Sequence, residues 1–180
     1  MVKPAVLFAG RLIAYKGLSW FVKHVLPLVD PAISLLVAGP VWDKDELDTV
    51  MREPRAKYVG TLGQTELNEL RSKVLACVMP NLPPEVSLQN EGFGLSALES
   101  PAVGTPVVAT TCGGLTEAVV DGTTGFLVAP LDAEGFAAKL NVIYSWTAQE
   151  RLAFSNKARE EIRTYFNWDR VAADYVSAIT

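Results

Sequence analysis

Short apolar runs recur along the chain, and most of them are nearly continuous Val, Ile, Leu and Ala without alternation of apolar and polar residues. Strands that are covered by helices on both faces have this composition, so the runs predict a parallel sheet. The six runs are Ala5–Ala9, Ile33–Ala38, Ala56–Val59, Val74–Met79, Thr105–Ala109 and Gly125–Ala129.

Helical patterns separate these runs. The clearest is Leu18–Val29, where apolar residues recur at three- and four-residue steps and form one stripe. Asp43 followed by Glu46 predicts a helix N-cap with its capping-box partner, and Thr147 with Glu150 predicts the same at the start of a long helix. Further helices are expected at Thr65–Lys73, Gly94–Val103, Leu115–Val120, Asp132–Ser145 and Asp169–Ile179.

The alternation of strands and helices predicts an α/β fold. We expect one Rossmann-like, doubly wound parallel sheet of about six strands, formed by residues 1–180 as a single domain. A ligand in such a fold binds beyond the carboxyl ends of the strands, which directs attention to the loops after the first, fourth and fifth strands. The proline cluster Pro80–Pro84 follows the fourth strand and predicts neither helix nor central strand.

Composition narrows the class of protein. With 49% hydrophobic and 20% charged residues, the 180-residue chain can bury a core of its own. A net charge of −4 argues against a nucleic-acid-binding surface. No run approaches the roughly 20 apolar residues that span a bilayer, and no signal peptide is expected. Cys77 and Cys112 are expected to be reduced, half-buried thiols of a cytoplasmic protein.

The loop after the first strand carries two cations just before a helix. It lacks the G-x-G-x-x-G fingerprint, which disfavours a nicotinamide-dependent reductase. Arg11 offers a planar fork for two phosphate oxygens, and Lys16, five residues later, offers a point charge. The free N–H groups at the start of the following helix supply further hydrogen-bond donors for an anion. Together these features suit a diphosphate, although either residue alone would be a solvated surface cation.

The segment after the proline cluster combines glycines with two carboxylates. Gly92 and Gly94 flank Phe93 and let backbone N–H groups approach a ligand. Glu91 and Glu99 lie eight residues apart, about 12 Å if the whole segment is helical. That exceeds the roughly 5–9.5 Å between the acid and base of glycosidases. The spacing favours carboxylates that hold hydroxyls at two ends of an elongated ligand.

In this order the segments resemble the C-terminal half of a retaining GT-B glycosyltransferase, most closely family 4, the glycosyltransferase group 1 type. Glu91 and Glu99 fit the E-x7-E motif of that family. The resemblance covers nearly the whole chain. The other matching segments are Gly10–Leu12, Lys16–Gly17, Gly104–Thr110, Gly113–Gly114, Glu117, Asp121–Val128 and Phe166–Asp169.

The resemblance implies that this half binds a nucleotide-diphosphate sugar, whose hexosyl group the full-length enzyme transfers with retention to a hydroxyl acceptor. It implies that Arg11 and Lys16 hold the diphosphate, that Glu91 contacts the transferred sugar, and that Glu99 takes the ribose hydroxyls. Arg11, Lys16 and Glu91 are the implied catalytic residues. The other implied donor-binding residues are Gly10, Gly60, Leu62, Gly92, Phe93, Gly94 and Leu95.

No metal and no other cofactor is expected, because the resemblance implies that side chains and helix ends neutralise the leaving diphosphate. His24 and the two distant cysteines make no metal-ligand cluster. A complete enzyme of this type has an N-terminal acceptor-binding half, which is expected to be missing here, so the chain alone is expected to be inactive or nearly so. Peripheral membrane association through that half stays open. The alternatives are a sugar-nucleotide epimerase of the same fold and a non-catalytic nucleotide-binding module.

Overall fold

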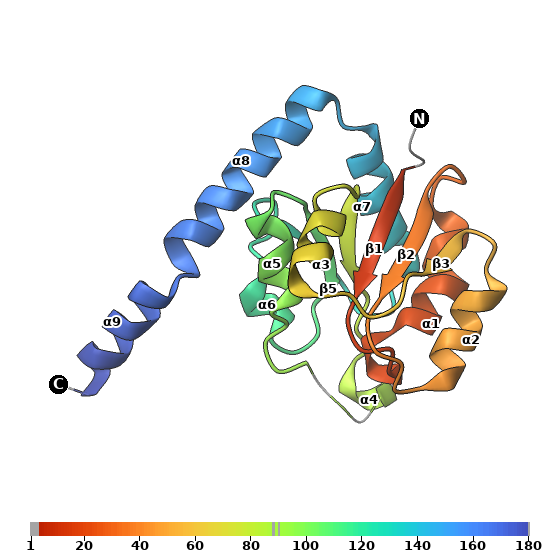
Figure 1. The fold of residues 1–180 in the computed structure, drawn as a ribbon, viewed down its shortest axis with the longest axis horizontal. Coiled ribbons are helices and arrows are strands. Elements are labelled where there is room, and N and C mark those ends of the chain that lie inside the picture. Colours follow the sequence, from red (N-terminus) through yellow and green to blue (C-terminus); the bar gives the residue numbers. More distant parts are fainter. Residues whose placement is uncertain (1–3, 88, 90, 180) are drawn as a thin grey trace.

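The computed structural model describes residues 4–87, 89 and 91–179. Six parallel strands form one sheet in the order β3-β2-β1-β4-β5-β6 (Figure 1), which confirms the expected doubly wound α/β fold. Each predicted apolar run corresponds to one strand, and only β5 extends past its run, by one residue to Thr110. The strands are β1 (Ala5–Ala9), β2 (Ser34–Ala38), β3 (Ala56–Tyr58), β4 (Ala76–Met79), β5 (Val107–Thr110) and β6 (Gly125–Val128).

Helices cover both faces of this sheet, which is why the strands carry apolar residues on both sides. One face packs against the helices of the N-terminal half and α7, where Phe21 and Phe136 meet edge to face with ring centroids 5.6 Å apart. The other face packs against α3, α5 and α6 through residues such as Leu67, Ala97 and Leu115. The helices are α1 (Leu18–Trp20), α2 (Lys44–Arg52), α3 (Gln64–Arg71), α4 (Pro84–Ser87), α5 (Ser96–Ala102), α6 (Leu115–Ala118), α7 (Ala133–Ser145), α8 (Ala148–Tyr165) and α9 (Trp168–Ile179).

The first predicted helix, Leu18–Val29, is less regular than its pattern suggests. After α1 the chain makes a π-helical turn over Phe21–Val25 and a 3₁₀ turn over Leu26–Leu28. Pro27 has no N–H to donate to the preceding turn, which disfavours a regular α-helix here. At the end of the segment, the carbonyl of Leu26 accepts from the N–H of Val29 at 3.3 Å and from the Arg55 guanidinium. The predicted apolar stripe is nevertheless buried.

One of the two predicted capping boxes is confirmed and the other is wrong. Thr147 Oγ1 accepts from the N–H of Glu150 at 3.2 Å, and the Glu150 carboxylate accepts from the N–H of Thr147 at 2.8 Å. Asp43 caps α2 by accepting from the N–H of Asp45. Glu46 does not complete a box there, because its carboxylate accepts from the N–H of Ser19, 2.8 Å away.

This buried contact predicts a pH effect on stability. Burial raises the pKa of the Glu46 carboxyl above its ordinary value of 4.5. A raised folded-state pKa means that the contribution of this group to stability is full below about pH 4.5 and is lost as the pH rises through the folded value. Glu46→Gln keeps an oxygen for Ser19 but cannot ionise. We expect urea unfolding to show the wild type losing stability relative to Glu46→Gln over that rise.

The matched control for this effect is Glu134→Gln, because Glu134 is exposed on α7. Its unfolding free energy should follow the wild type through the same pH range. Parallel pH profiles for Glu46→Gln and the wild type would show that the carboxyl at position 46 does not titrate differently on folding.

The remaining boundaries differ from the predictions by a few residues. The helix predicted at Gly94–Val103 begins at Ser96, and Pro84 of the proline cluster begins the short α4, because proline is well tolerated in the first helical turn. Both cysteines are free and buried, and burial raises the pKa of the Cys77 thiol to about 11. In the described part of the chain, none of the helices is long and apolar enough to cross a membrane.

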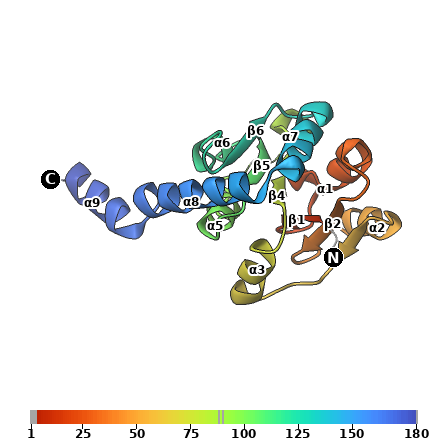
Figure 2. The ribbon, with the colours of Figure 1, turned by 90° about the horizontal axis from the view of Figure 1, so that it is seen from above.

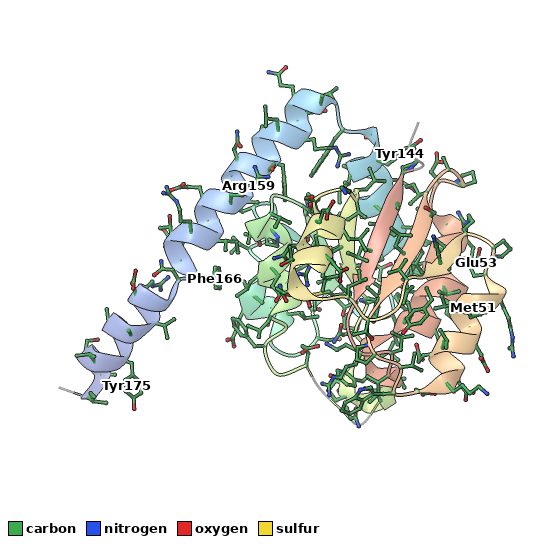
Figure 3. The ribbon with its side chains drawn as sticks, in the orientation of Figure 1. Met51, Glu53, Tyr144, Arg159, Phe166 and Tyr175 are labelled. Atoms are coloured by element: carbon green, nitrogen blue, oxygen red, sulfur yellow. The ribbon has the colours of Figure 1, made fainter. Side chains whose placement is uncertain are left out.

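The C-terminal helices leave the body of the domain. The middle of α8 packs on α5, and there the Arg159 guanidinium donates to the carbonyl of Val103 at 2.8 Å. Figure 2 shows α8 running past α5 and α9 continuing away from the sheet. In Figure 3, Phe166 lies where the two helices meet, and Tyr175, 69% exposed, lies on α9 far from the strands.

Candidate functional site

The order of the strands creates a crevice between the loops that follow β1 and β4. These two strands are neighbours in the sheet, with Val6 opposite Ala76, although β2 and β3 lie between them in the sequence. The helical connections therefore run in opposite directions from this point. In open α/β sheets, ligands bind outside the carboxyl ends of the strands at such a switch point.

Two glycines bring the neighbouring loops into contact. Gly39, with φ +137°, follows β2, and a Cβ there would lie 2.0 Å from the carbonyl oxygen of Gly10. Gly17, with φ +71°, follows the first loop, and a Cβ there would lie 1.9 Å from the carbonyl oxygen of Pro80. No side chain fits at either position. The backbone around the crevice is thus fixed by close packing of three loops.

A cavity of about 250 Å³ lies at this edge of the sheet. Its walls come from the ends of β1 and β2, the segment after β3, and helices α3 and α5. Its lining combines glycines and small apolar side chains with a few charged groups. The lining residues are Ala9, Gly10, Arg11, Ala38, Gly39, Pro40, Thr61, Leu62, Leu67, Arg71, Ser96 and Glu99.

Arg11 is the exposed cation of this lining. Its guanidinium carbon lies 4.7 Å from the ring centroid of Trp42, and its Nη2 donates to the hydroxyl of Tyr15 at 3.2 Å. Stacking on an aromatic ring orients a guanidinium without using all of its N–H donors. Arg11 is therefore held at the cavity and keeps donors for an anion.

Lys16 and Glu91 form an ion pair outside the cavity lining, and Tyr15 connects it to Arg11, since its hydroxyl accepts from Arg11 and its ring centroid lies 5.4 Å from Lys16 Nζ. The Lys16 ammonium contacts Oε2 of Glu91, and the side chains are only 12% and 11% exposed. The same carboxylate oxygen accepts from Nδ2 of Asn81 at 2.9 Å. Asn81 is buried, and its backbone carbonyl accepts from Thr110 Oγ1 at 2.7 Å. The loop after β4 is thus tied both to the first loop and to β5.

Glu99 lines the cavity from the first turn of α5. Its Oε2 accepts from Nη2 of Arg71 at 2.5 Å, and its Oε1 accepts from Nε2 of Gln64 at 3.2 Å. Only the part of the segment from Ser96 onward is helical. Gly94 has φ +81°, which no α-helix contains, so the helical span of 12 Å from Glu91 does not apply.

The structure brings only some of the predicted residues to the cavity. Gly10, Arg11, Leu62 and Glu99 line it, whereas Lys16 and Glu91 do not. Gly60 does not line it; its carbonyl instead accepts from the N–H of Gly39 at 2.9 Å. The carbonyl of Gly92 packs so closely on Gly114 that a Cβ there would be 2.2 Å away.

The backbone and the side chains of the predicted donor-binding segment Phe93–Leu95 face different surroundings. In the part of the chain that the structure describes, the N–H groups of Phe93, Gly94 and Leu95 have no hydrogen-bond acceptor. The side chains of Phe93 and Leu95 line a separate apolar groove together with Tyr165, Phe166 and others. The N–H groups of this segment are therefore unpartnered among the described residues, although Gly94 itself is buried, and the side chains of Phe93 and Leu95 belong to another surface.

Sequence reasoning missed four residues of the site. Arg71 and Gln64 on α3 hold Glu99, Asn81 holds Glu91, and the exposed Trp42 holds Arg11. Asn81 carried a signal, because it is a polar residue directly after the carboxyl end of a buried strand. The other three look like ordinary residues of polar helices and loops.

The strand order and the crevice define a Rossmann-like domain with a polar cavity at its switch point. Residues 3–145 match the family model for glycosyl transferases group 1, and the chain belongs to this family. The chain is 36% identical over 174 residues to a glycogen synthase from Mycobacterium tuberculosis. It is 41% identical over 179 residues to a D-inositol 3-phosphate glycosyltransferase from Corynebacterium urealyticum.

These alignments cover 93% and 94% of the chain but only 40% and 41% of the relatives, so the chain spans less than half of their length. Among solved structures, the sucrose-phosphate synthase from Thermosynechococcus elongatus superposes with a TM-score of 0.82 at 28% identity, covering 99% of this chain and 45% of that one. HepE from Anabaena in complex with UDP gives a TM-score of 0.82 at 21% identity, covering 97% and 48%. The fold is that of one half of a GT-B glycosyltransferase.

Proposed function

We propose that this chain is the donor-binding part of a retaining glycosyltransferase, which takes a hexosyl group from a nucleotide-diphosphate sugar to a hydroxyl acceptor. The observation that carries the proposal is the cavity at the switch point, where Arg11 and Glu99 share one lining and Tyr15 connects Arg11 to the Lys16–Glu91 pair. Membership of the group 1 family and the UDP-bound HepE structure support it. The acceptor site and the activity of the whole enzyme belong to the same proposal.

The charges of the site suit an elongated, doubly charged ligand. Arg11 offers free guanidinium donors at the cavity, and the three N–H donors of the Lys16 ammonium allow it to keep Glu91 while it binds a phosphate oxygen. Preorganised donors of this kind stabilise negative charge as it develops on a leaving diphosphate. We propose that these cations do so without a metal ion.

The two carboxylates would bind the two sugar rings of the donor. Glu91, held by Lys16 and Asn81, would accept hydrogen bonds from the transferred sugar, and Glu99 would accept them from the ribose. The N–H groups of Phe93, Gly94 and Leu95, which have no acceptor among the described residues, would meet the distal phosphate and the sugar. The cytoplasmic location expected from the sequence stays a prediction.

A panel of nucleotide sugars tests this proposal on the purified chain. We expect at least one of the UDP-, GDP- and ADP-sugars to raise the melting temperature, since ligand at a hundredfold over Kd adds about 2.7 kcal/mol of stability. Arg11→Ala should weaken that binding by about 1.5–3 kcal/mol in calorimetry, the contribution of a charge-assisted hydrogen bond.

Arg52→Ala is the matched control, because Arg52 is an exposed arginine of α2 that does not line the cavity. It should bind as the wild type does. No shift with any sugar of the panel, or equal affinity in Arg11→Ala and the wild type, would count against a donor site at this cavity.

A further inference from the structure

The cavity lining includes a buried arginine, Arg71, to which the proposed function assigns no role. Arg71 ends α3, lines the cavity, and its side chain is 1% exposed. Nη2 donates to Glu99 and Nη1 donates to Oδ1 of Asn68 at 2.8 Å, while Nε has no partner among the described residues. A charged side chain is rarely buried this completely unless it is paired. The role of Arg71 should therefore follow from what it does to its partner, Glu99.

That partner, Glu99, is held from α3 at both carboxylate oxygens. Arg71 binds Oε2 at 2.5 Å, and Gln64 binds Oε1 at 3.2 Å. Gln64 also donates to Asn68 at 3.3 Å, which joins the donors into one network. The Glu99 side chain is 34% exposed, and each carboxylate oxygen can accept a second hydrogen bond. The carboxylate is therefore oriented in advance and still accessible from the cavity.

We infer that Arg71 is a positioning residue that fixes the Glu99 carboxylate to accept the two adjacent hydroxyls of a ribose, and so makes the site prefer ribonucleotides over deoxyribonucleotides. The inference rests on the proposed function, because it takes the ligand to be a nucleoside diphosphate. Two vicinal hydroxyls need two acceptor oxygens in a fixed plane. A carboxylate whose rotamer is already set meets that need without losing side-chain entropy on binding.

The role of Arg71 can be tested only if the chain still folds when this residue is replaced. Removing one member of a buried ion pair destabilises a protein mainly by leaving the other charge buried and unpaired, but the Glu99 side chain is 34% exposed. Thr105 Oγ1 donates to the backbone carbonyl of Arg71 at 2.8 Å, so that contact survives any substitution at this position. Glu99 is exposed enough to be solvated by water. Arg71→Met is therefore expected to fold, and to free the Glu99 carboxylate to rotate.

The experiment compares ribo- and 2′-deoxyribonucleoside diphosphates of the base that gives the largest thermal shift. We expect calorimetry to show that the wild type binds the ribonucleotide about tenfold or more tightly than the deoxynucleotide, the contribution of a hydrogen bond to a charged acceptor. Arg71→Met should lose that ratio by weakening only the ribonucleotide. Arg71→Lys should restore part of it, and the exposed Arg52→Met should leave it unchanged.

Two outcomes overturn the inference. If folded Arg71→Met keeps the ribo-to-deoxy ratio of the wild type, or weakens both ligands equally, Arg71 does not position Glu99. Arg71→Gln, which keeps an amide donor without the charge, decides the question by the same ratio if Arg71→Met does not fold. If the wild type binds neither nucleotide, the proposed function itself fails. If it binds and Arg71 is without effect, only the present inference fails.

Discussion

Replacing Lys16 by alanine is expected to lower the free energy of unfolding by about 3 kcal/mol, because it removes the ammonium that faces a buried carboxylate. Lys16 and Glu91 are each about nine-tenths buried, with side-chain exposures of 12% and 11%. Their attraction is therefore little screened by solvent, and the Asn81 amide that donates to the same carboxylate oxygen carries no charge to replace the ammonium. Urea unfolding followed by circular dichroism measures the change.

The chain supplies a matched control for this substitution. Lys73 and Glu69 form an ion pair of the same chemistry on α3 and the turn after it, but their side chains are 63% and 64% exposed. Lys73→Ala should change stability little, since solvent screens such pairs. Glu91→Ala combined with Lys16→Ala should recover part of the loss, because no buried carboxylate is left without the Lys16 ammonium. Equal effects of Lys16→Ala and Lys73→Ala would mean that the Lys16–Glu91 pair is solvated in solution.

The second large effect concerns turnover. We expect the purified 180-residue chain to bind a nucleotide sugar and to transfer no sugar to candidate acceptors. Much of the rate of a transferase comes from holding donor and acceptor in a near-attack geometry, and from walls that exclude water. Here the cavity is lined from one Rossmann-like sheet, and the chain spans only 40% of the glycogen synthase that it matches.

Radiolabelled donor incubated with the chain and a set of acceptors measures this directly. A full-length member of the family, run in parallel, checks that the assay detects transfer. Slow hydrolysis of the donor would be compatible with the expectation. Robust transfer that disappears in Glu91→Ala would contradict it, and would mean that the single domain is a complete enzyme.

Local patterns in the sequence determined the elements of this fold. Each of the six apolar runs gave one strand, and the central strands β1, β4 and β5 are buried almost throughout, whereas the edge strand β3 carries the exposed Lys57. The capping box at Thr147 formed as predicted, because both of its hydrogen bonds close within four residues. The sequence also indicated the loops after the first and fourth strands as candidate binding loops, which lead to Arg11 and to Glu99 of α5. The reason is that ligands of doubly wound folds bind beyond the carboxyl ends of the strands.

The tertiary structure decided what these residues contact. Glu46 left its predicted capping box for the N–H of Ser19, 27 residues away. The first helical segment ends in a 3₁₀ turn that contains Pro27 and whose Leu26 carbonyl accepts from Arg55, a residue distant in the sequence. Arg71 looks like the polar end of a helix, yet the packing of α3 on α5 buries it behind Glu99. The physical reason is the same in each case: a local pattern fixes backbone conformation and the buried face, whereas the partner of a long polar side chain depends on which segments the strand order brings together.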